Sequence, residues 1–192
     1  MQSRSERSER ARRQAVQVMD STTARAAMPS APPPLVRWMR QYLGLQEERG
    51  PNGEPANTGT LICEWLRAAG VACPNPWCAA QVSRGLAETG ASRPTYRGAR
   101  ALGYAEESPR DYQASLTQAP PQGALVQYRW SARAQHIAVV DSVMENGRYR
   151  TISGNTSGPP CPGDHGCGVF RHVRQANRAN FYAPTRVIPV TY

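Results

Sequence analysis

Apolar residues in the first half of the chain recur every three to four positions, the spacing of helices that bury one face. Two such stretches are LVRWMRQYLGL, from Leu35, and TGTLICEWLRAAG, from Thr58. Asn57 or Thr58 is the predicted N-cap of the second helix, and Gly70 is its predicted stop. The two apolar stripes are Leu35, Trp38, Met39 and Tyr42, and Leu61, Ile62, Trp65, Leu66 and Ala69.

A third helical stretch, NPWCAAQVSRGL, carries a cysteine near its start. Asn75 is a suitable N-cap and Pro76 a suitable first helical residue, so Cys78 is expected at about the third position. Gly90 is the expected stop. Unpaired N–H groups and the helix dipole favour an anion at this end, which predicts a thiol pKa below the usual value of about 8.5. The apolar stripe consists of Ala79, Val82 and Leu86.

Beyond residue 120 the pattern changes to the alternation of apolar and polar residues that is typical of strands. Asn146 and Gly147, between two such stretches, are a strong signal for a two-residue hairpin turn. Because helices come first and antiparallel strands follow, the predicted fold class is α+β, with the helices packed on one face of the sheet. The expected strands are GALVQYRW (123–130), QHIAVVDSVM (135–144), RYRTISGN (148–155), GVFRHVR (168–174) and a fifth within FYAPTRVIPVTY (181–192).

The hairpin predicts which residues face each other across the two strands. If only Asn146 and Gly147 form the loop, counting back from the turn pairs Ala138 with Asn155. His136 lies two residues before Ala138 and points to the same side, so His136 and Asn155 become diagonal neighbours, with Cα atoms about 7–8 Å apart. A bulge or another type of turn would break this register.

Length and composition predict one folded domain with a tail in front of it. The chain has 192 residues, too few for two full domains. Residues 1–33 are polar, rich in Arg and Ser, and close on SAPPP, which predicts a basic tail or linker; a short helix that anchors on a partner is the alternative. Residues 34–192 are the predicted folded domain. The N-terminus has no apolar segment typical of a secretory signal peptide, and no apolar run is long enough for a membrane span.

The basic residues indicate an anionic partner but do not identify it. The formal net charge is +9, and all 23 basic residues are Arg. A cell wall, an anionic lipid surface or a nucleic acid would each be attracted. Nucleic-acid binding is not expected, because no aromatic residues are interleaved along a basic stripe.

Five cysteines leave at least one thiol unpaired if the others form disulfides within the chain, and Cys78 is the candidate. The segment CPGDHGC offers possible metal ligands in Cys161, Asp164, His165 and Cys167. A disulfide between Cys161 and Cys167 is the favoured interpretation, because structural zinc sites use paired motifs at tighter spacing. Cys63 lies beside Ile62 on a predicted helix, so buried packing is its expected role.

Cysteine, histidine and asparagine together form a known type of catalytic set. The imidazole takes the thiol proton and later protonates the leaving group, while the third residue holds the ring in one tautomer. This predicts Cys78 as nucleophile, His136 as base and Asn155 as orienting residue. The structural alternatives are a buried packing cysteine, a core histidine and a turn asparagine.

Four segments carry a resemblance to a known family: EPANTGTLICEWLRAAG, NPWCAAQVSRGL, GALVQY with QHIAVVDSV, and ISGNTSG with GCGV. Over residues 54–175 the chain resembles the CHAP family of cysteine peptidases and amidases, within the NlpC/P60 superfamily. The resemblance implies a papain-like fold and the same roles for Cys78, His136 and Asn155. The chain departs from the family pattern at three places: Ala124 replaces an aspartate, Gln135 a glycine, and Ser153 an acidic residue.

The resemblance implies hydrolysis of amide bonds in peptidoglycan by a thiol mechanism that needs no metal or organic cofactor. Peptidoglycan is then the partner, with phage tail or virion proteins as further partners of the N-terminal tail. The predicted protein is a phage lysin, either a virion component or a released endolysin, that acts in the bacterial cell wall or periplasm. Two alternatives stay open: a degenerate structural virion protein with a CHAP-like fold, and an amidase effector delivered by a secretion system.

Overall fold

Helices precede strands in the structure, a computed structural model that describes residues 31–107, 119–129, 135–159, 161, 166–175 and 186–192. Pro32 to Tyr192 form one compact unit. The predicted tail or anchor falls on residues 1–33, almost all outside the described residues, and stays a prediction. The helices are α2 (Pro34–Arg40), α3 (Thr60–Ala68), α4 (Cys78–Glu88) and α5 (Ala101–Glu107); the strands are β1 (Leu125–Arg129), β2 (Gln135–Val143), β3 (Arg148–Thr156), β4 (Gly168–Gln175) and β5 (Arg186–Ile188).

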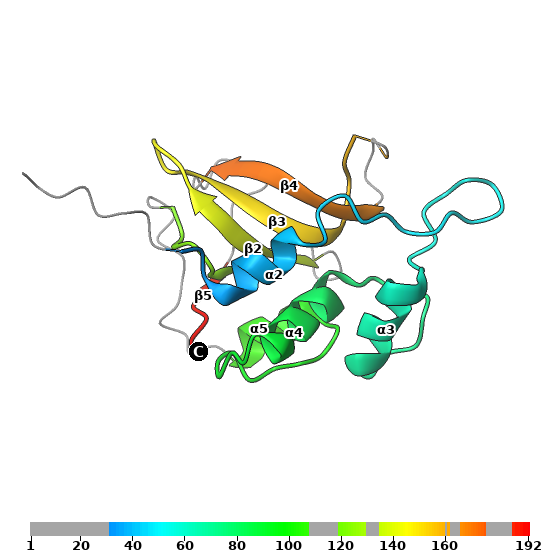
Figure 1. Cartoon of the computed structure of the whole chain (residues 1–192), viewed down its shortest axis with the longest axis horizontal. Helices are drawn as coiled ribbons and strands as arrows, with labels where there is room; N and C mark the ends of the chain where they lie inside the picture. Colours follow the sequence, from blue (N-terminus) through cyan, green and yellow to red (C-terminus); the bar gives the residue numbers. More distant parts are fainter. Residues whose placement is uncertain (1–30, 108–118, 130–134, 160, 162–165, 176–185) are drawn as a thin grey trace, which may run out of the picture. The chain divides into compact units, whose positions relative to one another are not determined.

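The strands form one antiparallel sheet in the order β4-β3-β2-β1-β5 (Figure 1). This confirms the predicted α+β class. All five strands lie within or close to the stretches that alternation predicted. The seven-residue helix α5 was not predicted, because it is too short to show a helical period. Tyr104 on α5 is fully buried, which indicates that packing stabilises this helix.

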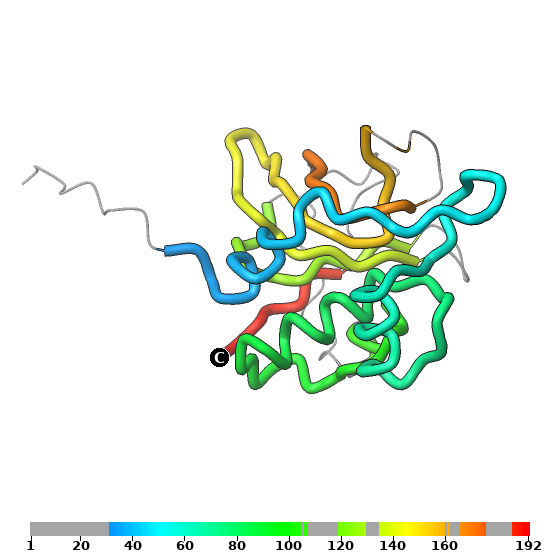
Figure 2. Tube along the Cα trace, turned by 45° about the vertical axis from the view of Figure 1, so that its right-hand side comes forward, coloured from blue at the N-terminus to red at the C-terminus, as the bar shows by residue number. Residues whose placement is uncertain are grey.

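Helices cover one face of the sheet, as predicted, and a second apolar cluster lies on the opposite face. Helices α4 and α5 lie on the same side of the strands in both views (Figures 1 and 2). The helix-side core includes Leu35, Trp65, Leu86, Ile137, Val139 and Ile152. The second cluster consists of Ala124, Val126, Tyr128, Ala138, Val140 and Tyr149. Because neighbouring residues of a strand point to opposite faces, Ile137 and Ala138 belong to different clusters.

Helix α3 ends where the sequence predicts but begins without the predicted cap. Gly70 follows its C-terminus with a φ of 76°, and Gly90 follows α4 with a φ of 70°, so both predicted stops are confirmed. The N-cap of α3 is Gly59, and no side chain caps the helix. Asn57 is used elsewhere: it has a φ of 50°, and its backbone N–H donates to the Glu47 carboxylate at 2.6 Å.

The turn between β2 and β3 forms as predicted, but the register does not. Asn146 and Gly147 both have positive φ, and the Arg148 N–H donates to the Glu145 carbonyl. The Met144 N–H also donates to the Arg148 carbonyl, and a second irregularity follows at 140–142, so each site shifts the pairing by one residue. The predicted pairing of Ala138 with Asn155 is therefore wrong by two residues. Side chains alternate between the two faces of the sheet with a period of two. A total shift of two residues therefore leaves each residue on the face that was predicted for it.

Two disulfides join four of the cysteines, and Cys78 is free. The Cys161–Cys167 pair is confirmed; Asp164 and His165 lie outside the described residues. Cys63 pairs with Cys73, with Cα atoms 5.2 Å apart, so the expectation of simple packing for Cys63 was wrong. Helical spacing cannot show that the loop after α3 folds back onto it. Cys78 is the unpaired thiol, as predicted.

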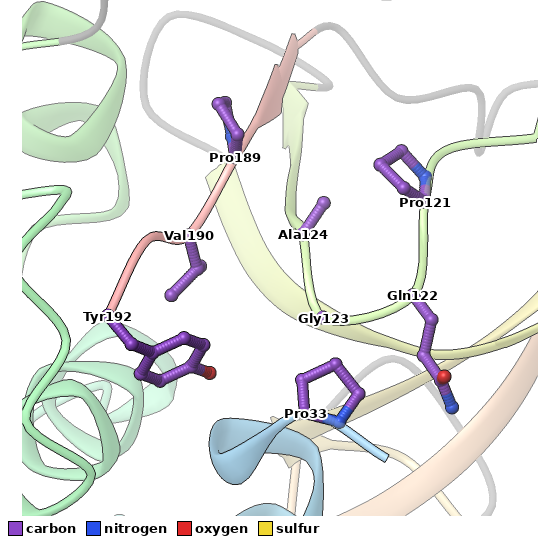
Figure 3. A pocket seen from close by; sticks show the side chains of 8 residues that line it. All are labelled: Pro33, Pro121, Gln122, Gly123, Ala124, Pro189, Val190 and Tyr192. Carbon is purple, nitrogen blue, oxygen red and sulfur yellow. The ribbon is translucent and has the colours of Figure 1, made fainter. Parts of the chain in front are cut away.

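A pocket of about 190 Å³ lies between Pro33, the turn before β1 and the C-terminal residues (Figure 3). Tyr192 helps to line it and accepts a hydrogen bond from the Leu35 N–H. The pocket is at the start of β1, whereas His136 pairs with Tyr128 near the other end of that strand, so it is separate from the predicted catalytic residues. No helix in the described part of the chain is long and apolar enough to cross a membrane.

Candidate active site

Cys78 is the first residue of α4 and only 7% of it is exposed. The predicted cap at Asn75 is wrong: Trp77 takes the N-cap position, and the Asn75 side chain donates to the Ala72 carbonyl. The helix therefore begins two residues later than predicted, and the thiol lies at its very start. At this position the thiol accepts hydrogen bonds from free N–H groups of the first turn, those of Cys78 and Ala79.

The start of α4 contacts both β2 and β3 beyond their last paired residues, and we call this place the opening. The pairing of the two strands ends at Val139 and Ile152. On one side, the Ile137 backbone of β2 hydrogen-bonds the Cys78 thiol. On the other, Gly154 of β3 faces the Trp77 ring so closely that a Cβ atom there would meet it at under 3.0 Å.

The opening brings together the segments that carry all three predicted catalytic residues. His136 precedes Ile137, and Asn155 follows Gly154, so each lies one residue from a contact of α4. The assignment of Cys78, His136 and Asn155 as one catalytic set stays a prediction, supported by this common location.

The thiol is protonated more readily than the sequence predicts. Burial raises the pKa of Cys78, while the backbone N–H groups of Ile137, Ala79 and Cys78 itself lower it without compensating fully. The expected depression of the thiol pKa is therefore wrong in this structure. A helix terminus stabilises an anion by roughly 0.3–1 kcal/mol, which the loss of hydration in a closed site can exceed.

His136 is buried and neutral. Its ring stacks on Tyr128, with centroids 6.3 Å apart and planes inclined by 25°. Burial, followed by the charges of Arg174 and His172, lowers the pKa of His136 to about 3. A neutral imidazole at physiological pH has the protonation state of a general base.

Asn155 lies at the end of β3 in a strained backbone conformation. Its φ is 51°, and the pairing of β3 with β4 is irregular between Ser153 and Thr156. Gly166 packs directly against it, since a Cβ atom on Gly166 would meet the backbone and side-chain oxygens of Asn155 at under 3.0 Å. The left-handed conformation is one that asparagine tolerates better than most residues.

Glu47 supports the opening and was missed by the sequence analysis. It is 6% exposed, and its two carboxylate oxygens accept hydrogen bonds from Trp77 Nε1 at 2.7 Å and the Asn57 N–H at 2.6 Å. Its own N–H donates to the Cys167 carbonyl. Glu47 thus ties the residue before the nucleophile to the Cys161–Cys167 loop. In the sequence it stands in QEER, which is typical of an exposed polar segment, so no signal indicated its burial.

We expect Glu47→Gln to loosen the start of α4. A glutamine has one acceptor oxygen where two donors must be satisfied, so one buried bond is lost, at a cost of about 1–3 kcal/mol in the free energy of unfolding. The Cys78 thiol should then react about three- to tenfold faster with iodoacetamide, because the change opens the buried site. Cys78 is the one free thiol, so its alkylation can be followed directly by mass spectrometry.

The matched control is Glu48→Gln, at the neighbouring exposed carboxylate. It removes the same charge and should leave both unfolding and alkylation at wild-type values. Equal behaviour of the two variants would show that Glu47 does not hold the thiol in place.

Comparison with known proteins supports the resemblance that the motifs indicate. Residues 70–155 match the family model of the CHAP domain. The match contains Cys78 and His136 and ends at Asn155. Searches of curated proteins and of solved structures found no match. Residues 70–155, which contain the thiol and the strand segments around it, are therefore similar to the CHAP domain, a similarity consistent with an amidase or peptidase.

Proposed function

We propose that the chain hydrolyses amide bonds of peptidoglycan with Cys78 as nucleophile, His136 as general base and Asn155 as the residue that orients the imidazole. The observation that carries this proposal is the free thiol at the first residue of α4, in contact with the strand that bears His136. The CHAP domain match supplies the substrate class.

The reaction would proceed in two steps. The Cys78 sulfur attacks the amide carbonyl while its proton passes to His136, and the tetrahedral oxyanion accepts a hydrogen bond from the Cys78 N–H. His136 then protonates the leaving nitrogen, the C–N bond breaks, and a thioester remains. Water, deprotonated by His136, adds to the thioester carbonyl, and the C–S bond breaks to give a carboxylate and the free thiol.

The resting state should hold a neutral thiol and a neutral imidazole. Burial raises the pKa of Cys78 and lowers that of His136, so a preformed thiolate–imidazolium pair is disfavoured. Proton transfer must then accompany the attack on the substrate. The imidazole also has to approach the sulfur, and Asn155 is proposed to hold the ring during that approach.

Digestion of purified peptidoglycan tests the proposal. The wild-type protein should release fragments with new amino ends, and Cys78→Ala should reduce the rate by at least about 10⁴-fold. Mass spectrometry of the fragments identifies the bond that is cut. Unchanged melting of the variant shows that its fold is intact.

Two results of the digestion would contradict the proposal. If neither protein releases fragments from walls of several chemotypes, the hydrolase proposal is wrong and the degenerate structural virion protein becomes the better hypothesis. Release that persists in Cys78→Ala would instead rule out this thiol as nucleophile. The assignment to a phage lysin stays a prediction, because it rests on the N-terminal residues 1–33.

A further inference from the structure

Three exposed arginines lie on the α2 side of the sheet, near the β2–β3 hairpin. Arg148 and Arg150 are on β3 and alternate with buried residues; Arg171 is on β4. The register pairs Arg171 with Ile152, a member of the helix-side core, so all three arginines share that face. We call these three residues the arginine strip.

The spacing of the strip brings like charges together. Arg148 and Arg150 are two residues apart on one face, about 7 Å between Cα atoms, and Arg171 is a diagonal neighbour of Arg150 across the strands. Like charges at such positions repel, so contacts among the three arginines themselves do not stabilise the fold. The cross-strand partner of Arg150 is Val173, which is 46% exposed and lies two residues after Arg171 on β4.

The strip lacks enough acidic partners within the described residues. Asp141 is 3% exposed and is shared by two arginines: Arg40 Nε at 2.7 Å and Arg171 Nε at 2.9 Å. Its single charge is therefore already used. Arg148 and Arg150 have no ion pair and no side-chain hydrogen bond in the described part of the chain. Two exposed guanidinium groups are thus left with their donors directed to solvent.

We propose that the arginine strip binds carboxylates of the peptidoglycan stem peptides and holds the protein on its polymeric substrate. This rests on the proposed function, which supplies the polymer. A guanidinium group binds a carboxylate through two parallel hydrogen bonds, and several such contacts along a polymer add up. Arg148 and Arg150 lie at the hairpin end of β2 and β3, and Ser142, the partner of Arg150, is six residues or about 20 Å along the strand from His136. A bound stem peptide at the strip therefore leaves the thiol accessible to another.

Co-sedimentation with insoluble peptidoglycan, freed of phosphate-containing polymers, tests this surface. The Cys78→Ala background prevents digestion during the measurement. Adding Arg148→Gln and Arg150→Gln should weaken binding at least about fivefold and reduce its dependence on salt. In the active protein, the same two changes should leave the hydrolysis of a small soluble muropeptide within about twofold of wild type.

The matched control changes two arginines that already have partners. Arg84 pairs with Glu88 on α4, and Arg100 pairs with Glu106 on α5. Arg84→Gln with Arg100→Gln lowers the net charge by the same amount and should weaken binding less than twofold. Equal losses in the two double variants would show that net charge, and not the strip, attracts the wall.

Other outcomes also overturn the proposal or separate it from the proposed function. Strip-dependent binding only to walls that retain phosphate polymers, to duplex DNA or to anionic vesicles would assign the strip to another partner. Strip-dependent binding to the stripped peptidoglycan, combined with no hydrolysis by the active protein, would support the surface and contradict the hydrolase.

Discussion

His136→Gln is expected to lower kcat/KM for peptidoglycan fragments by about 10³–10⁴-fold. The glutamine amide can fill part of the space of the imidazole but cannot take the thiol proton or return it to the leaving nitrogen. Because the resting thiol is protonated, no preformed thiolate can compensate for the lost base. Steady-state rates on a soluble muropeptide give the measurement, and thermal melting checks that the variant folds.

The same substitution should change how stability depends on pH. In the folded protein the pKa of His136 is about 3, against about 6.5 in an unfolded chain, so between these values the unfolded state binds the extra proton. Stability from this residue is thus present above pH 6.5 and is lost as the pH falls toward 3, by about 1.4 kcal/mol per pH unit. Urea unfolding of His136→Gln at pH 4–7 should show a shallower decline than that of the wild type.

His172→Gln serves as the comparison, since burial also lowers the pKa of His172 but its side chain bonds to Thr156 on the neighbouring strand. It should flatten the pH profile of stability while leaving most of the hydrolysis intact. Full activity of His136→Gln would exclude the imidazole as the base, whatever the pH profile.

Gly154→Ala should damage both the fold and the site. The new methyl group would meet the buried Trp77 ring and the Gln81 side chain at under 3.0 Å, and neither Trp77 nor Gln81 has exposed surface into which to move. Overpacking of this kind costs about 1–3 kcal/mol. Trp77 adjoins Cys78, so its displacement moves the thiol, and a shift of about 1 Å is enough for a 100-fold loss of rate.

Gly53→Ala is a suitable control for this substitution. Nothing lies within 4 Å of the added methyl group there, although the φ of 81° adds a backbone cost of about 1–2 kcal/mol. Gly53→Ala should therefore lose some stability but keep wild-type rates of hydrolysis. If Gly154→Ala also keeps wild-type rates, the contact between Trp77 and β3 does not position the nucleophile.

Local sequence patterns predicted most of the fold. The stops at Gly70 and Gly90 and the turn at Asn146 depend on backbone conformations that few residues adopt, so the residue type alone indicates them. Strand positions followed from alternation, because successive side chains of a strand point to opposite faces of the sheet. The helix starts at residues 60 and 78 were missed because neither asparagine caps its helix: the Asn57 N–H donates to the Glu47 carboxylate, and the Asn75 side chain donates to the Ala72 carbonyl.

The sequence by itself determined the class of the protein: an α+β domain with a free cysteine at a helix start, a histidine on one strand and an asparagine on the next. These features depend on residue type and on neighbours within a few positions. The tertiary structure decided what depends on distant contacts. Two irregularities moved the β2–β3 register by two residues, and burial reversed the expected shift of the Cys78 pKa. The buried carboxylate of Glu47 against Trp77 likewise joins positions 30 residues apart, and only packing brings them together.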